Sequence, residues 1–105
     1  SKPMAEYTRL MSADEVPPGT CKPAVVDGRA ILVANVDGEL FAVSDECTHA
    51  GAPLNQGFIE GRQIQCPFHG ASFCLKTGRA LAPPAGEDLA SYPIRVVDGQ
   101  IEVAA

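Results

Sequence analysis

The sequence has no tryptophan, only two histidines, and eight lysines and arginines against thirteen aspartates and glutamates. The resulting formal net charge of −5 argues against a nucleic-acid-binding protein, because the phosphate backbone requires a basic surface. The chain also lacks a run of about 20 apolar residues, the length that a membrane-spanning helix needs. We therefore expect neither a nucleic acid nor a membrane as its partner.

The first residues of the sequence do not have the form of an export signal. The first ten residues, SKPMAEYTRL, contain no basic segment followed by an apolar one. We therefore expect a soluble cytoplasmic protein. The 105 residues, 46% of them hydrophobic and 20% charged, are typical of a globular chain and suffice for one modest core. We predict a single domain that covers residues 1–105.

Three Asp-Gly pairs, each flanked by β-prone residues, indicate tight hairpin turns, because both residues of such a turn adopt positive φ angles. The pairs are Asp27-Gly28, Asp37-Gly38 and Asp98-Gly99. The strands expected beside them are Lys22–Val26, Arg29–Val36, Glu39–Ser44, Ser91–Val97 and Gln100–Val103. Hairpins of this kind join antiparallel strands, so the sequence predicts an all-β fold.

Shorter elements are expected between these hairpins. A single helical turn is predicted at Ser12–Val16, where Pro17-Pro18 ends it. A loop is predicted at Leu81–Asp88, either as an ordinary connection or as a lid over a metal site. Further short strands are predicted at Tyr7–Met11, Gly57–Glu60, Gln63–Gln65 and Ala71–Leu75.

Both histidines stand close to a cysteine. The segment from Cys47 to Gly70 reads CTHAGAPLNQGFIEGRQIQCPFHG, which is C-x-H, sixteen residues, and then C-x2-H. A predicted strand leads directly into each pair, so a rigid scaffold can present both loops. We predict one metal site built from the two loops, with Cys47, His49, Cys66 and His69 as its ligands.

Three kinds of site are compatible with these cysteines. Two disulfides are typical of secreted chains, but they do not require histidine at metal-ligand spacing. Structural zinc usually takes its cysteines from a C-x2-4-C knuckle, whereas each half here mixes one cysteine with one histidine. In a [2Fe–2S] cluster in which two imidazoles replace two thiolates on one iron, each loop gives its cysteine to one iron and its histidine to the other. The mixed pairs favour this third site.

The two loops resemble the two-box signature of Rieske iron–sulfur proteins. Cys47–His49 is similar to the first box and Cys66–Gly70 to the second. The resemblance extends over about residues 16 to 103 and is closest to the small Rieske ferredoxins of bacterial aromatic-ring-hydroxylating dioxygenase systems. The residues that carry this narrower resemblance are Phe73, Thr77-Gly78 and Tyr92-Pro93.

The resemblance implies a fold and a cofactor. The fold would be the Rieske type, stacked antiparallel sheets with an inserted cluster-binding subdomain at about residues 45–80. The cofactor would be one [2Fe–2S] cluster, with its inner iron on Cys47 and Cys66 and its outer, more exposed iron on His49 and His69. Small apolar residues near both boxes, Leu54 and Phe68 among them, would pack around the cluster or form a docking patch.

The resemblance also implies a function, that of an electron carrier and not an enzyme. The chain would act as a monomer that takes single electrons from an NAD(P)H-dependent flavoprotein reductase and passes them to a terminal oxygenase. The chain cannot contain the mononuclear iron centre that a Rieske oxygenase also needs, because that centre takes two further histidines, so the chain could only be a fragment of such an enzyme. The alternative is a Rieske-like small subunit of a larger reductase complex, such as nitrite reductase.

Departures from high-potential respiratory Rieske proteins indicate a low reduction potential. Ala52 and Phe68 stand where those proteins carry an additional pair of disulfide-bonded cysteines, and Ala71 and Phe73 where they carry hydroxyl groups that face the cluster sulfurs. Hydrogen bonds to sulfur stabilise the reduced cluster, so their loss lowers the potential. We expect the remaining cysteines, Cys21 and Cys74, to be small buried apolar residues.

Overall fold

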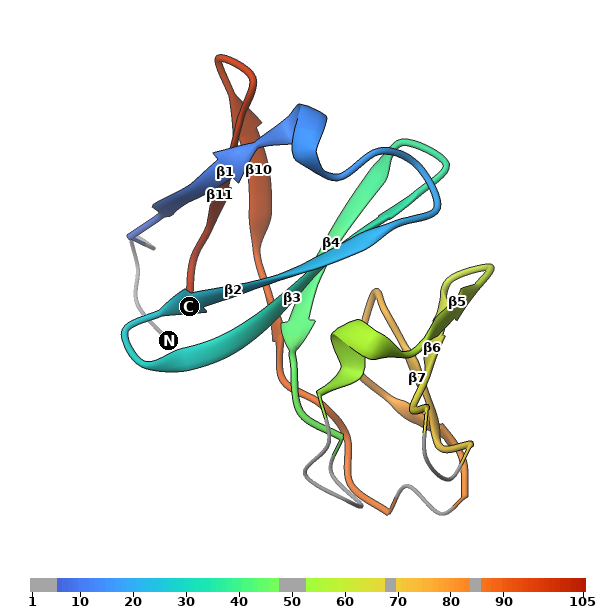
Figure 1. Ribbon diagram of the computed structural model, residues 1–105. Coiled ribbons are helices and arrows are strands. Elements are labelled where there is room, and N and C mark those ends of the chain that lie inside the picture. Colours follow the sequence, from blue (N-terminus) through green and yellow to red (C-terminus); the bar gives the residue numbers. More distant parts are fainter. Residues whose placement is uncertain (1–5, 48–52, 68–69, 84–85) are drawn as a thin grey trace.

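The computed structural model describes residues 6–47, 53–67, 70–83 and 86–105 (Figure 1). Within these ranges the fold consists of β-strands and two short 3-10 turns, which confirms the all-β prediction. No helix in the described ranges has the length and apolar character needed to cross a membrane.

The strands form three antiparallel sheets, in the orders β1-β11-β10, β2-β3-β4-β9 and β5-β6-β7-β8. The two 3-10 turns are η1 at Ala13–Glu15 and η2 at Leu54–Gln56. The strands are β1 Thr8–Ser12, β2 Cys21–Val26, β3 Arg29–Val36, β4 Glu39–Ser44, β5 Phe58–Glu60, β6 Gln63–Gln65, β7 Ser72–Cys74, β8 Ala80–Ala82, β9 Ser91–Tyr92, β10 Ile94–Val97 and β11 Gln100–Val103.

All three Asp-Gly hairpins are confirmed. The aspartates have φ angles of 50°, 53° and 51°, and the glycines that follow them are also positive. These angles match the turn type whose twist suits two-residue hairpins. The turns join β2 to β3, β3 to β4 and β10 to β11 in antiparallel register.

The sheet that contains β3 and β4 is the middle layer of the molecule, because side chains from both of its faces are buried. Along β3, Ile31 and Val33 enter one core, whereas Leu32 and Ala34 enter the other. Alternate residues of a strand point to opposite faces. The run of apolar residues in β3 is thus explained by burial on both sides.

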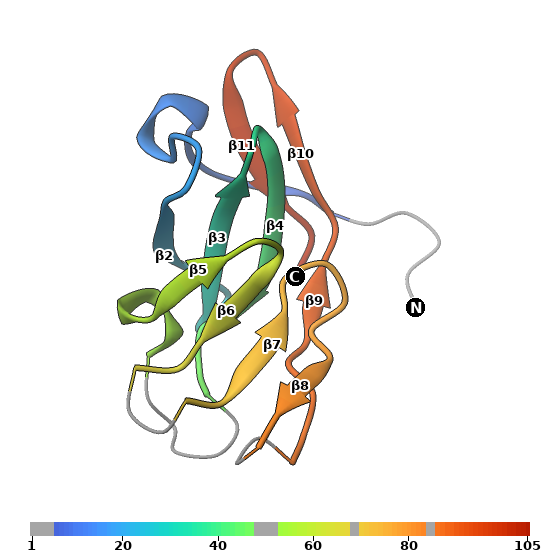
Figure 2. The same cartoon turned by 90° about the vertical axis from the view of Figure 1, so that its right-hand side faces the viewer.

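The two cores differ in composition. The first, here called the aliphatic core, lies between the middle sheet and the β1-β11-β10 sheet. Its buried members are Val16, Val26, Ile31, Val33, Ala42, Ile101 and Val103. The second, here called the thiol core, lies between the middle sheet and the β5-β6-β7-β8 sheet (Figure 2). Its buried members are Leu32, Ala34, Phe41, Val43, Cys47, Leu54, Ile64, Cys66, Ala71, Phe73, Leu75 and Leu89.

Two predicted elements require correction. The expected strand Ser91–Val97 is divided at Pro93 into β9, which pairs with β4, and β10, which pairs with β11. Proline has no N–H to continue a ladder, so the chain changes sheets there. The predicted loop Leu81–Asp88 begins inside β8, which pairs with β7 as an edge strand.

The predicted helical turn at Ser12–Val16 is confirmed as the 3-10 turn η1. The backbone N–H of Ser12 donates to Glu15 Oε2 at 3.1 Å, and the N–H of Asp14 donates to Ser12 Oγ at 3.3 Å. These reciprocal bonds are a capping box, which satisfies backbone donors at the start of a helical turn.

Candidate metal centre

The first predicted ligand, Cys47, follows the end of β4. Two backbone bonds fix the chain just before it, from the Ser44 N–H to the Ala90 carbonyl at 2.9 Å and from the Asp45 N–H to the Ala30 carbonyl at 3.0 Å. Ala30 lies in β3 and Ala90 precedes β9, so strands on both sides hold the end of β4. Cys47 is 1% exposed and is part of the thiol core.

A side-chain clamp spans the first loop at its base. The Asp45 carboxylate accepts the backbone N–H of Asn55 on Oδ1 at 2.8 Å and the Asn55 side-chain amide on Oδ2 at 2.5 Å. Asp45 precedes Cys47 by two residues, and Asn55 lies in η2. The Cys21 thiol of β2 donates to the Asn55 carbonyl at 3.6 Å, which links this base to the middle sheet.

The second predicted ligand, Cys66, opens the loop between β6 and β7. Its N–H donates to the Ala71 carbonyl at 2.7 Å, just beyond the pair formed by Gln65 and Ser72. Gly70 has a φ of +76°, a conformation that side chains disfavour, so glycine suits the return into β7. Cys66 is 2% exposed.

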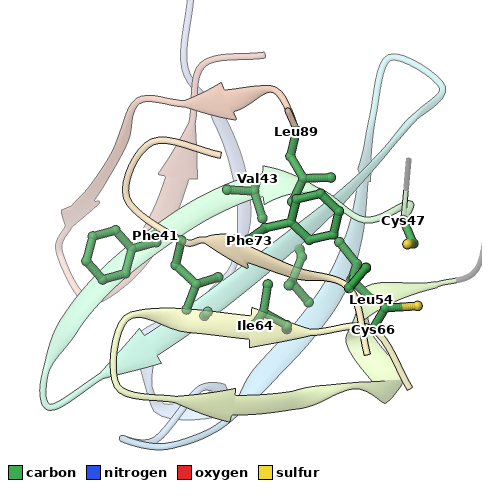
Figure 3. Close-up of a cluster of buried hydrophobic side chains, with 12 residues drawn as sticks. Phe41, Val43, Cys47, Leu54, Ile64, Cys66, Phe73 and Leu89 are labelled. Atoms are coloured by element: carbon green, nitrogen blue, oxygen red, sulfur yellow. The ribbon is translucent and has the colours of Figure 1, made fainter. Parts of the chain in front are cut away.

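Both cysteines lie at the same end of the thiol core (Figure 3). They come from segments about twenty residues apart, one after β4 and one after β6. All four cysteines of the chain are free thiols, so the disulfide alternative has no support in the structure. The fold therefore places two soft sulfur donors, one after a strand of the middle sheet and one after a strand of the β5-β6-β7-β8 sheet, in the same core.

The other two predicted ligands, His49 and His69, lie outside the described residues, as do Ala52 and Phe68. The complete ligand set therefore stays a prediction. What the structure contributes is the position of its two sulfur donors. Thiolates bind iron and zinc well, and two free buried thiols at the start of the two histidine-bearing loops fit a cluster with mixed ligands.

Of the two roles expected for Leu54, packing near the boxes or forming a docking patch, the structure supports packing. Leu54 is fully buried in the thiol core, at 0% exposed. It lies in η2, immediately before Asn55, and its buried side chain anchors η2 in the thiol core. Pro53 is exposed and Pro67 is half-buried. Leu54 is thus a packing residue and not a docking residue.

The remaining two cysteines differ from each other. Both are predicted to be buried, but each is only partly buried. Burial raises the pKa of the Cys21 thiol, and the nearby charge of Asp45 raises it further. For Cys74, partial burial also raises the pKa, but hydrogen bonds from Thr77 and Lys76 and the charge of Lys76 outweigh it. The net pKa of Cys74 therefore lies below its ordinary value, which favours its thiolate.

Sequence reasoning missed three residues that shape the site. Asp45 and Asn55 form the clamp, and Gly57 lies against β6, where an added Cβ would lie 2.0 Å from the carbonyl oxygen of Gln65. Only glycine fits so close to the residue before Cys66. The available signals were an acid two residues before the first box and a glycine directly before β5.

Comparisons with known proteins agree with this arrangement. Residues 6–93 match the family described as the Rieske [2Fe-2S] domain. The biphenyl dioxygenase ferredoxin subunit of Pseudomonas sp. (strain KKS102) is 41% identical over 91 residues, which cover 86% of this chain and 84% of that protein.

Two solved structures are also similar. One, a complex of reduced oxygenase and oxidized ferredoxin in carbazole 1,9a-dioxygenase, contains a chain that is 31% identical, with a TM-score of 0.88 over 93% of this chain and 92% of that one. The other is a putative NADH-dependent nitrite reductase small subunit from Mycobacterium tuberculosis. It is 25% identical, with a TM-score of 0.87 over 97% of this chain and 96% of that one.

Proposed function

Because the chain belongs to the Rieske [2Fe-2S] domain family, we propose that it carries single electrons to the terminal oxygenase of an aromatic-ring dioxygenase system. The cofactor of this family is a Rieske [2Fe–2S] cluster. The chain is a ferredoxin component, an electron carrier and not an enzyme in its own right. When bound, the cluster supplies one-electron redox chemistry, and the protein supplies its position and surroundings.

The observation that carries this proposal is the placement of Cys47 and Cys66 as free, buried thiols at one end of the thiol core. We assign these two residues to one iron and His49 and His69 to the other. With two thiolates and two neutral imidazoles as ligands, the net charge of the cluster and its ligands becomes more negative by one on reduction. Beside a formal net charge of −5, that change is small enough for one surface to meet two partners in turn.

The proposed partners are a flavoprotein reductase, which supplies the electron, and a terminal oxygenase, which receives it. The similar carbazole 1,9a-dioxygenase structure contains an oxygenase together with a ferredoxin, which supports the second partner. A reductase that uses NAD(P)H works where that reductant is made, so we place the chain in the cytoplasm. We propose that it acts there as a monomer with a low reduction potential.

Reconstitution tests this function. The purified chain, with its cluster, is combined with the flavoprotein reductase and the terminal oxygenase encoded nearest to it in its genome, and NADH oxidation is followed together with formation of hydroxylated aromatic product. We expect product to form only when the chain is present. The same chain reduced by dithionite should be reoxidised by the oxygenase alone. A reduced chain that the oxygenase leaves unchanged would refute the proposal.

The second candidate function is that of a nitrite reductase small subunit, which the 25% identity to such a protein supports. The two functions differ in how tightly the chain is held. A subunit would co-purify in fixed ratio with a large reductase chain, whereas a carrier that serves two partners must dissociate from each. Purification of an affinity-tagged chain from its native host distinguishes them, and we expect the chain to elute alone from a size-exclusion column.

A further inference from the structure

Asp45 is a charged residue whose side chain is buried. Among the described residues it is the only buried charged side chain, at 7% exposed. No lysine or arginine in those ranges forms an ion pair with it. Within the described ranges its side chain accepts two hydrogen bonds from Asn55, at 2.8 Å from the backbone N–H and 2.5 Å from the side-chain amide. Burying a carboxylate without a cation is costly, so such a group needs a reason to be retained.

Its surroundings suggest that reason. Asp45 precedes Cys47 by two residues, so their Cα atoms are at most about 7 Å apart. Both side chains are buried, and charges interact more strongly there than across water. Amide donors orient the carboxylate without cancelling its charge, whereas a lysine or arginine would have cancelled it.

We propose that the Asp45 carboxylate, held by Asn55, has two roles toward the cluster. It is a positioning group that closes the base of the first loop, and its fixed negative charge lowers the reduction potential. Reduction adds a negative charge at the cluster, and a nearby buried negative charge opposes that change. This inference depends on the proposed attachment of the cluster to Cys47, which iron and sulfide analysis tests separately.

The size of the effect follows from Coulomb's law. At an effective dielectric constant of about 20, removal of one charge changes a reduction equilibrium about tenfold when the charge lies about 12 Å from the redox centre, and by more when it lies closer. For a one-electron couple, tenfold corresponds to about 59 mV. This electrostatic contribution is separate from the missing hydroxyl groups at Ala71 and Phe73, which also favour a low potential.

The test uses three variants of the cluster-containing chain. Asp45→Asn removes the charge and keeps an oxygen that can accept the Asn55 N–H. Asn55→Ala removes one donor of the clamp and keeps the charge. Glu46→Gln is the matched control, since it removes the same charge from an exposed side chain one residue before Cys47. Redox titration gives each potential, and thermal unfolding gives each stability.

We expect Asp45→Asn to shift the reduction equilibrium about tenfold toward the reduced form. Glu46→Gln should shift it several times less, because water screens the exposed side chain. Asn55→Ala should lower the unfolding temperature and leave the potential equal or lower, because its carboxylate remains and has lost a donor.

Two results would overturn the proposal. One is a shift for cluster-replete Asp45→Asn no greater than that of Glu46→Gln. The other is a raised potential in Asn55→Ala, which keeps the charge. If Asp45→Asn does not assemble its cluster, a potential of Asn55→Ala above that of the wild type still overturns the proposal.

Discussion

The two cores of the molecule share the middle sheet, yet they are built differently. The aliphatic core contains only aliphatic side chains in its buried part and is closed by hairpins with two-residue turns. The thiol core contains two buried aromatic rings and two free thiols, and its outer sheet has strands of only three residues. The aliphatic core thus acts as a support, and the thiol core, with shorter strands, holds the two cysteines of the predicted site.

This difference shows how the fold separates stability from function. Residues of β3 and β4 contribute to both cores, so the strands that stabilise the support also hold the end of the first loop. The short strands β5 to β8 have little ladder of their own. We therefore expect damage to the thiol core to remove the cluster, and equal damage to the aliphatic core to leave it in place.

The largest effect is expected from a charge placed inside the thiol core. Leu54→Asp buries a carboxylate at a position that is 0% exposed and should lower the free energy of unfolding by about 4 kcal/mol or more, with loss of the cluster. Phe58→Asp is the control, because Phe58 is 65% exposed. Urea unfolding followed by circular dichroism measures both. A stable, cluster-replete Leu54→Asp chain would show that Leu54 lies at the surface.

A cavity in each core tests the comparison directly. Phe73→Ala and Ile31→Ala each remove a fully buried side chain, one from the thiol core and one from the aliphatic core. Each should lower the free energy of unfolding, by about 3 to 5 kcal/mol for phenylalanine and about 2 to 5 kcal/mol for isoleucine. Iron content should fall only in Phe73→Ala. Equal iron loss in both variants would mean that the two cores do not act separately.

A smaller effect is expected from a hydroxyl group near the second loop. Ala71 is fully buried, and its carbonyl accepts the N–H of Cys66. Ala71→Ser offers a donor towards the cluster and should raise the reduction potential by some tens of millivolts, because a net hydrogen bond is worth about 1 kcal/mol. Ala42→Ser is the matched control in the aliphatic core. The missing-hydroxyl explanation fails if redox titration gives both variants the wild-type potential.

The smallest effect is a difference between the rates at which two thiols are labelled. The pKa of Cys74 is lowered and that of Cys21 is raised, so at pH 7 a larger fraction of Cys74 is thiolate. Iodoacetamide should therefore alkylate Cys74 first, and raising the pH should speed the reaction at Cys21 more. Mass spectrometry of digested, briefly treated protein gives the order. Faster labelling of Cys21 at pH 7 would contradict the environments described for the two thiols.

The sequence predicted the support better than the site. Asp-Gly turns and alternating β-prone residues are local signals, and they located every hairpin around the middle sheet. Pro93 is a further local signal, because proline cannot continue a ladder, but the predicted strand Ser91–Val97 extends through it. The C-x-H and C-x2-H spacings predict Cys47 and Cys66 as ligands, and the fold places both in the thiol core, but their role as ligands stays a prediction.

What could not be predicted depends on contacts between distant segments. The burial of Leu54 follows from the packing of η2 into the thiol core, which no local pattern encodes. The bonds between Asp45 and Asn55 join residues ten positions apart across a loop. The edge strand β8 has only three residues and forms because β7 supplies a partner. In each case tertiary structure, and not local propensity, decides the outcome.

The most direct test of the central claim is the iron and acid-labile sulfide content of the purified chain, measured beside Cys47→Ser, Cys66→Ser and the control Cys21→Ser. We predict two iron and two sulfide per chain for the wild type and for Cys21→Ser, as a [2Fe–2S] cluster requires, and neither element in the other two variants. One zinc per chain without sulfide, or a full cluster in Cys47→Ser and Cys66→Ser, would contradict the account.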